Sequence, residues 1–101
     1  MRLVLVIHSG PESHNTNSLV KMAKAARAKG HDVTVFAMSA GVGNLARADF
    51  TALAARGVNI TVCEHNRSQF KAPEGIEGVT YGSQYELAGF VADGDKVVIF
   101  E

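Results

Sequence analysis

Leu3-Val4-Leu5-Val6-Ile7, close to the start of the chain, is an uninterrupted run of branched aliphatic residues. Such runs are typical of strands that are buried on both faces, as the strands of a parallel sheet are. The period then changes, because Leu19, Met22, Ala23 and Ala26 recur at helical spacing in residues 17–29. The opening run therefore predicts the first strand of a sheet whose strands alternate with helices.

The rest of the chain repeats this alternation. Strands are expected at residues 3–7, 32–36, 59–63, 78–81 and 96–100, and helices at residues 17–29, 45–56, 66–71 and 84–92. Ser83 and Glu86 have the spacing of a capping box at the start of the last helix. Alternating strands and helices predict a parallel sheet with right-handed crossovers. We therefore predict a single domain, residues 1–101, of the α/β class: a three-layer α/β/α sandwich around a parallel five-stranded sheet.

Composition excludes several classes of protein. Hydrophobic residues make up 47% of the 101 residues, which excludes disorder. Ten basic residues balance ten acidic ones, so no nucleic-acid partner is expected. No apolar run approaches the roughly 20 residues of a membrane helix, and the apolar start is too short for a signal peptide. The one cysteine cannot form an intramolecular disulfide, which favours the cytoplasm.

The loops that follow the expected strands are the candidates for function. In an open parallel sheet, ligands bind outside the carboxyl ends of the strands. Residues 8–16, 38–44, 63–68 and 81–84 occupy that edge, and they are rich in Gly, Ser, Asn and His. The opposite edge has only plain turns. We therefore expect any site to lie at the carboxyl edge.

Cys63 is the candidate with the most distinctive chemistry. It follows the third expected strand and precedes a helix start, where backbone N–H groups favour a thiolate. A nearby Arg67 or a protonated His65 would favour the thiolate further. Free cysteine is also among the most buried residue types. Cys63 is thus either a reactive, sulfur-carrying thiol or a small structural residue.

Other polar residues at this edge have two interpretations each. Five residues of the first loop could cradle a phosphate through backbone amides at a helix N-terminus: Ser9, Gly10, Ser13, Asn15 and Thr16. Residues 15–17 could equally cap that helix. His8 and His14 share this loop and could lie near His65, or each could be a polar loop residue. Asn66 could order the loop that presents the thiol, or simply cap a short helix. The histidines lack ligand spacing, so no metal and no cofactor are expected.

Several short motifs occur in an order that resembles one family. They are Gly30-His31-Asp32-Val33-Thr34-Val35-Phe36, Gly41-Val42, the helix end at 53–58, Val62-Cys63, Tyr81-Gly82-Ser83 with Glu86-Leu87-Ala88, and 95–100. In this order and spacing, the chain resembles the DsrE/DsrF-like family, which includes TusD-type sulfur-relay proteins.

The resemblance implies both a fold and a function. It implies the DsrE-like fold, with Gly41 and Val42 as one of its recurring elements. In sulfur-relay members a cysteine at the position of Cys63 carries sulfur as a persulfide, which implies a sulfur carrier or sulfurtransferase with sulfur donor and acceptor proteins. A homo-oligomer, trimer or hexamer, is also implied. The small size of the chain and the Ala-rich helical face of Ala23, Ala25 and Ala26 agree with this.

Two other functions remain open at this point. The chain could be a binding module for a nucleotide, flavin or other small anion at the same edge, with Cys63 incidental. It could also be a non-catalytic oligomeric protein. Reactivity of the thiol favours sulfur transfer, whereas a co-purified or coloured ligand favours the binding module.

Overall fold

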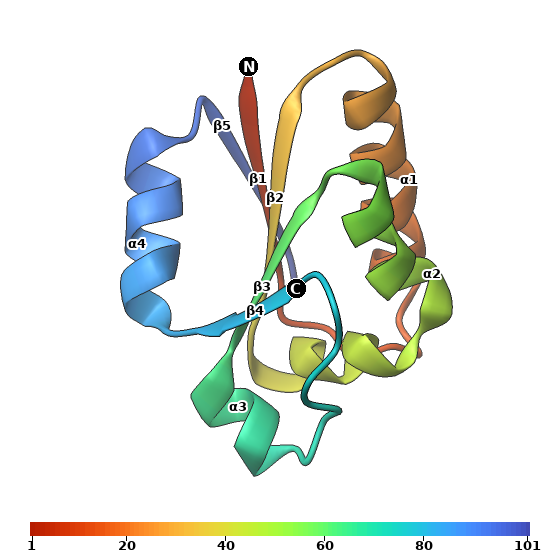
Figure 1. Ribbon diagram of the computed structural model, residues 1–101, viewed down its shortest axis with the longest axis vertical. Coiled ribbons are helices and arrows are strands. Elements are labelled where there is room, and N and C mark those ends of the chain that lie inside the picture. The colour runs from red at the N-terminus through yellow and green to blue at the C-terminus, as the bar shows by residue number, and fades with distance from the viewer.

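Five parallel strands form one sheet in the order β4-β3-β2-β1-β5 (Figure 1). The computed structural model describes all residues, 1–101. The strands are β1 (Arg2–Ile7), β2 (Asp32–Ala37), β3 (Asn59–Cys63), β4 (Val79–Gly82) and β5 (Lys96–Phe100). The helices are α1 (His14–Ala28), α2 (Ala48–Thr51), α3 (Glu64–Gln69) and α4 (Gln84–Asp93), with 3₁₀ helices η1 (Ser39–Ala46) and η2 (Ala52–Arg56). Each expected strand is confirmed to within one residue at either end.

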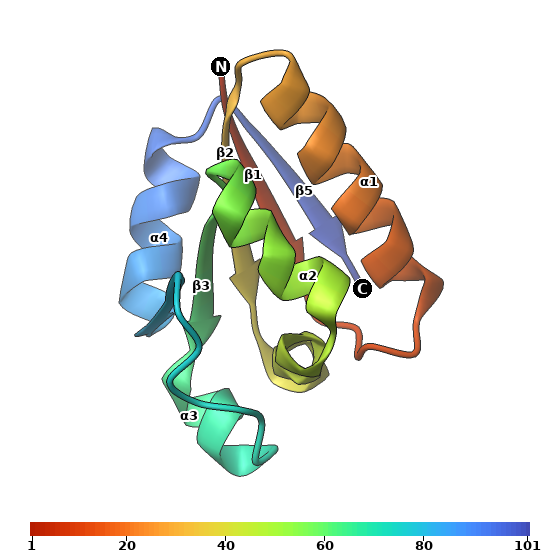
Figure 2. The ribbon, with the colours of Figure 1, turned by 45° about the vertical axis from the view of Figure 1, so that its right-hand side comes forward.

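Helices cover both faces of the sheet. Helices α1 and α2 lie on one face and α4 lies alone on the other, while α3 extends beyond the carboxyl edge (Figures 1 and 2). The three-layer α/β/α arrangement predicted from the sequence is therefore confirmed. No helix is both long and apolar enough to span a membrane.

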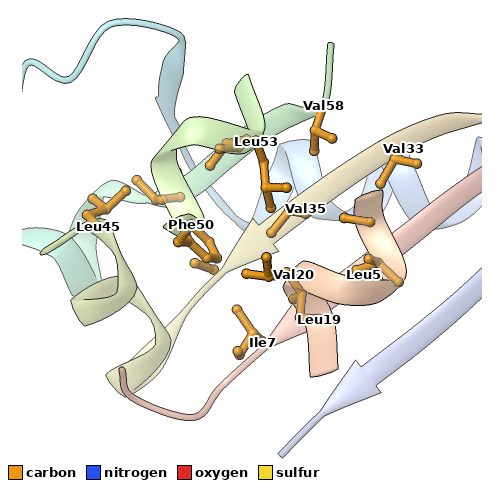
Figure 3. Packing of buried hydrophobic residues seen from close by; sticks show 14 of the residues in the cluster. Leu5, Ile7, Leu19, Val20, Val33, Val35, Leu45, Phe50, Leu53 and Val58 are labelled. Carbon is orange, nitrogen blue, oxygen red and sulfur yellow. The ribbon is translucent and has the colours of Figure 1, made fainter. Parts of the chain in front are cut away.

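The main core lies between the sheet and the helices α1 and α2. It contains 17 buried residues, including Leu5 of β1, Leu19 of α1 and Phe50 of α2 (Figure 3). Each such side chain contributes on the order of 1.5–3 kcal/mol when it leaves water. The opposite face is covered more thinly. Val4 and Phe36 are buried there, but α4 itself has no buried residue.

Helix α1 differs from its expected form in two respects. It begins at His14 rather than at residue 17, because the Ser13 side chain caps it by accepting a hydrogen bond from the Asn15 backbone N–H at 3.1 Å. Val20, not Met22, completes the buried face, and Met22 is 38% exposed. Because the helix starts earlier, Thr16 belongs to its buried face, which consists of Thr16, Leu19, Val20 and Ala23.

The prediction of a single helix at 45–56 is wrong. Three shorter pieces, η1, α2 and η2, occupy the region from 39 to 56. Arg47 separates η1 from α2 because its backbone is extended, with φ −94° and ψ 126°. Its guanidinium donates to the Pro11 carbonyl (2.9 Å), to Asn17 Oδ1 (2.8 Å) and to Asp49 (2.7 and 2.9 Å). These hydrogen bonds fix the break, and the two to Asp49 lower the pKa of that carboxyl group.

The last two helices begin close to the carboxyl ends of neighbouring strands. Helix α3 begins at Glu64, two residues before its expected start, and Cys63 occupies its N-cap position. The capping box of α4 is confirmed: Ser83 Oγ accepts from the Tyr85 N–H, and the Glu86 carboxylate accepts from Ser83. The hydrogen bond from the Ser83 side chain lowers the pKa of Glu86.

Candidate functional site

Cys63 is the last residue of β3 and lies on the face of the sheet opposite the main core. Val62 belongs to the core cluster, and the alternation of side chains along a strand places Cys63 on the other face. The residue is 5% exposed and forms no disulfide. Its side chain makes no capping hydrogen bond to α3. A free thiol therefore stands at the carboxyl edge, beside the first backbone N–H groups of a helix.

The thiol opens into a pocket of about 530 Å³, a volume typical of small-molecule sites. One wall is the first turn of α3, and the other is the turn between β4 and α4. The lining residues are Cys63, His65, Asn66, Gly82, Ser83, Gln84 and Tyr85. Two other hollows, of about 210 and 390 Å³, lie at the amino edge and beside η2, and no cysteine or histidine lines them. The pocket beside the thiol, here called the Cys63 pocket, is the candidate site.

Gly82 is the residue of β4 that pairs directly with Cys63 on the adjacent parallel strand. A Cβ atom at position 82 would lie 3.1–3.3 Å from the Glu86 side chain. The register between β3 and β4 thus places the turn that begins α4 beside Cys63.

Two carboxamides connect the pocket to the turn after β2. The Ser39 backbone N–H donates to Asn66 Oδ1 at 2.8 Å, and Ser39 has a left-handed backbone with φ 53°. Asn66 Nδ2 donates in turn to Gln69 Oε1 at 3.1 Å. On the opposite wall, Gln84 Nε2 lies 3.9 Å from Met38 Sδ. The segment Met38–Ser39 therefore braces both walls of the pocket.

Arg67 contributes to structure rather than to the pocket. Its guanidinium donates to Glu64 at 2.8 and 2.9 Å and to the Ala72 carbonyl at 3.0 Å, and it lies 3.6 Å from Glu74. The hydrogen bond from Arg67 lowers the pKa of Glu64. Arg67 therefore ties the connection between α3 and β4 together. Its charge is matched by carboxylates and it does not line the pocket.

The residues expected from the first two loops form a separate cluster around Asn44. Asn15 Nδ2 donates to Ser9 Oγ at 2.8 Å, and the Asn44 carboxamide donates to the carbonyls of Ser9 and Gly41, each at 2.9 Å. Gly10 takes part through its carbonyl, and Val42 is buried in the main core. These residues join the first loop to η1.

The cluster around Asn44 lies apart from the thiol. Strand β2 separates β1 from β3, and two strand spacings amount to about 10 Å. Figure 2 shows η1 between α3 and the loop that precedes α1. His8 is half-buried, and its backbone N–H donates to the Phe100 carbonyl at 2.9 Å. Strand β2 therefore separates the loop at 8–16 from Cys63, contrary to expectation, whereas η1, which contains residues 41–44, contacts both β3 and α3.

Sequence analysis missed part of the pocket. Of the expected supporting residues, His65 and Asn66 line it, whereas Gly82, Ser83, Gln84 and Tyr85 were not among them. The loop at 81–84 had been placed at the carboxyl edge. The missing step was the pairing of β4 with β3, which makes this loop the direct neighbour of Cys63. No group of three or more His, Cys, Asp or Glu side chains is placed to hold a metal ion.

The fold and the pocket define a class: a small parallel α/β protein with one free thiol beside a helix N-terminus at the carboxyl edge of its sheet. Residues 1–100 match the model of the DsrE/DsrF-like family, and the chain belongs to that family. No curated protein matches it.

Two solved structures share this fold. The ychN protein from E. coli superimposes with a TM-score of 0.87 at 23% sequence identity, covering 99% of both chains. BT1422 from Bacteroides thetaiotaomicron, a conserved protein of unknown function, superimposes with a TM-score of 0.79 at 16% identity, covering 98% of this chain and 94% of that one. Both comparisons confirm the DsrE-like fold.

Proposed function

We propose that this protein is a sulfur carrier that holds sulfane sulfur as a persulfide on Cys63. The observation that carries the proposal is the placement of a free, 5% exposed thiol in a pocket of about 530 Å³ at the carboxyl edge of the sheet. Membership of a family that includes sulfur-relay proteins supports the same function. A free thiol also suits the reducing cytoplasm, where we place the protein.

The chemistry requires only thiol–persulfide exchange. The Cys63 thiolate attacks the outer sulfur of a donor persulfide, a new S–S bond forms to Cys63 Sγ, and the bond between the two donor sulfurs breaks. The donor leaves as a thiolate and takes up a proton. In the transfer to an acceptor cysteine, the acceptor thiolate attacks the outer sulfur on Cys63, and Cys63 leaves as the thiolate. No oxidant or reductant is consumed.

The start of α3 lies beside the reacting sulfur. Cys63 is the N-cap residue of α3, and no side chain caps the first backbone N–H groups of that helix. N–H groups at a helix start attract negative charge within the first turn, so they would hold an anionic donor close to Cys63. His65 lies on the same wall of the pocket. Arg67, with its charge matched by Glu64, is assigned no part in binding the donor.

Intact-mass measurement tests the proposal. After incubation with a small persulfide donor and removal of excess reagent, the wild-type chain should gain the mass of one sulfur atom, and Cys63→Ser should gain none. Because Cys63 is the only cysteine, the result is unambiguous. A wild-type chain that stays unmodified, while a free cysteine peptide in the same tube is loaded, would contradict the sulfur-carrier function.

A small-molecule binding module is the second candidate. The pocket volume fits a ligand, and the N-terminus of α3, which no side chain caps, borders it and favours an anion. This function would be favoured by a nucleotide, flavin or other anion that co-purifies with Cys63→Ser as well as with the wild-type chain.

We also propose that the protein is a homo-oligomer, trimer or hexamer, associating through the face that carries α4. Ile99 on the edge strand β5 is 57% exposed, and Val91 and Tyr85 on α4 are 45% and 85% exposed. The Ala-rich face of α1 is less suitable, because Ala23 is fully buried in the main core. Exposed apolar side chains on a thinly covered sheet face favour association.

Replacing Ile99 with lysine should therefore lower the mass of the assembly. Light scattering at micromolar concentration should give a multiple of the 10.7 kDa chain for the wild type and a smaller multiple for Ile99→Lys. A lysine at Ala25, exposed on α1, serves as the matched control and should leave the mass unchanged. The α4 face would be excluded if only Ala25→Lys dissociates the assembly.

A further inference from the structure

Gln84 is the residue of the Cys63 pocket whose side chain already bonds to sulfur. It is the first residue of α4, its side chain lines the pocket, and its Nε2 lies 3.9 Å from the thioether sulfur of Met38. A thioether is a weak hydrogen-bond acceptor. The amide of Gln84 therefore loses only a weak hydrogen bond when it turns from Met38 to another acceptor.

Two other side-chain donors of the pocket have strong acceptors. Asn66 Nδ2 donates to Gln69 Oε1 at 3.1 Å, and Ser83 Oγ lies 2.6 Å from the Glu86 carboxylate. His65 and Tyr85 also line the pocket, but neither is held against a sulfur atom. Gln84 is the donor of the pocket whose amide already lies against a sulfur acceptor.

We infer that Gln84 binds the outer sulfur of the Cys63 persulfide by turning its amide N–H from Met38 to that atom. This inference rests on the proposed function. Loading Cys63 adds an atom about 2 Å beyond Sγ, and the free volume for it is the pocket that Gln84 lines. The outer sulfur of an ionised persulfide carries negative charge, and charge-assisted hydrogen bonds are roughly twice as strong as neutral ones. Gln84 is thus a positioning residue that favours the loaded over the unloaded protein.

The test is a sulfur-exchange equilibrium. The full chain is mixed with cysteine and cysteine persulfide at a series of ratios, and intact mass gives the fraction that carries one additional sulfur. Gln84→Ala should lower the equilibrium constant for loading of the protein by about fivefold, which is the effect expected from the loss of one net hydrogen bond. Gln84→Glu should shift it further, because a carboxylate repels the persulfide anion.

A second readout separates this role from a merely structural one. The rate of alkylation of the unloaded thiol by iodoacetamide should stay within about twofold of wild type in Gln84→Ala, because Gln84 acts on the sulfur that is added. Met38→Leu removes the competing sulfur acceptor, keeps a similar volume, and should leave loading unchanged or raise it.

Two results would overturn the inference. One is a loading constant for Gln84→Ala within about twofold of wild type, because that change is smaller than the loss of one net hydrogen bond would cause. The other is an equal loss of loading in Met38→Leu, which would indicate that packing of the wall matters instead. Either result leaves the sulfur-carrier function standing. A wild-type protein that takes up no sulfur at all defeats the proposed function itself.

Discussion

Gly41→Ala is expected to lower the free energy of unfolding by about 3 kcal/mol or more, at the upper end of what overpacking costs. A Cβ atom at position 41 would overlap the Ile7 carbonyl oxygen and lie 2.9 Å from the Ile7 carbonyl carbon. Ile7 is hydrogen-bonded within the sheet, where β1 pairs with both β2 and β5. The Ile7 backbone cannot move without breaking this pairing, so the contact cannot relax cheaply.

Chemical denaturation followed by circular dichroism measures this effect. Gly89→Ala is the matched control, because a Cβ atom there meets nothing within 4 Å and Gly89 lies within α4. That change should raise stability by roughly 0.5–1 kcal/mol, since alanine is the better helix former. A Gly41→Ala protein as stable as wild type would show that the close approach of η1 to β1 is not required.

Asn44→Ala is expected to cost about 2–4 kcal/mol, because it leaves several buried polar groups without partners. Asn44 is fully buried, donates to the carbonyls of Ser9 and Gly41, and accepts from Thr16 Oγ1 at 2.6 Å. Removing the carboxamide leaves two carbonyl oxygens unsatisfied and weakens the link between the first loop and η1. Thr16 keeps its bond to the Gly10 carbonyl, which limits the loss.

Asn17→Ala provides the comparison for Asn44→Ala. Asn17 is an exposed residue of α1 that accepts one hydrogen bond from Arg47, so its replacement should change stability by no more than about 0.5 kcal/mol. Both variants should be measured by the same denaturation experiment. Equal losses in the two variants would show that the buried network around Asn44 contributes nothing special.

Both predictions assign a structural role to residues that sequence analysis had considered for binding. Gly41 is needed where η1 passes over the end of β1, and Asn44 joins that segment to the loop after β1. The same residue types would suit an anion site or a tight turn. Their local sequence does not distinguish the two roles, because the decisive contacts are to residues about 30 positions away in the chain.

The position of the thiol could be predicted, whereas most of its surroundings could not. Cys63 at the end of β3 followed from a strand pattern that ends at a polar loop. His65 and Asn66 followed from their proximity in sequence, and both line the pocket. Ser83 and Gln84 approach from a strand that pairs with β3 only in the folded protein.

The sequence by itself determined the parallel α/β class, the strand positions and the family. A strand that is buried on both faces requires a continuous apolar run, and such strands alternate along the chain with the helices that cover them. Tertiary structure decided which loops share a site. All strand ends reach the same edge, but the order β4-β3-β2-β1-β5 places the turn before α4 beside Cys63 and moves the loop after β1 two strands away. Strand order depends on how the crossovers pack, and that packing is a property of the whole chain rather than of any local segment.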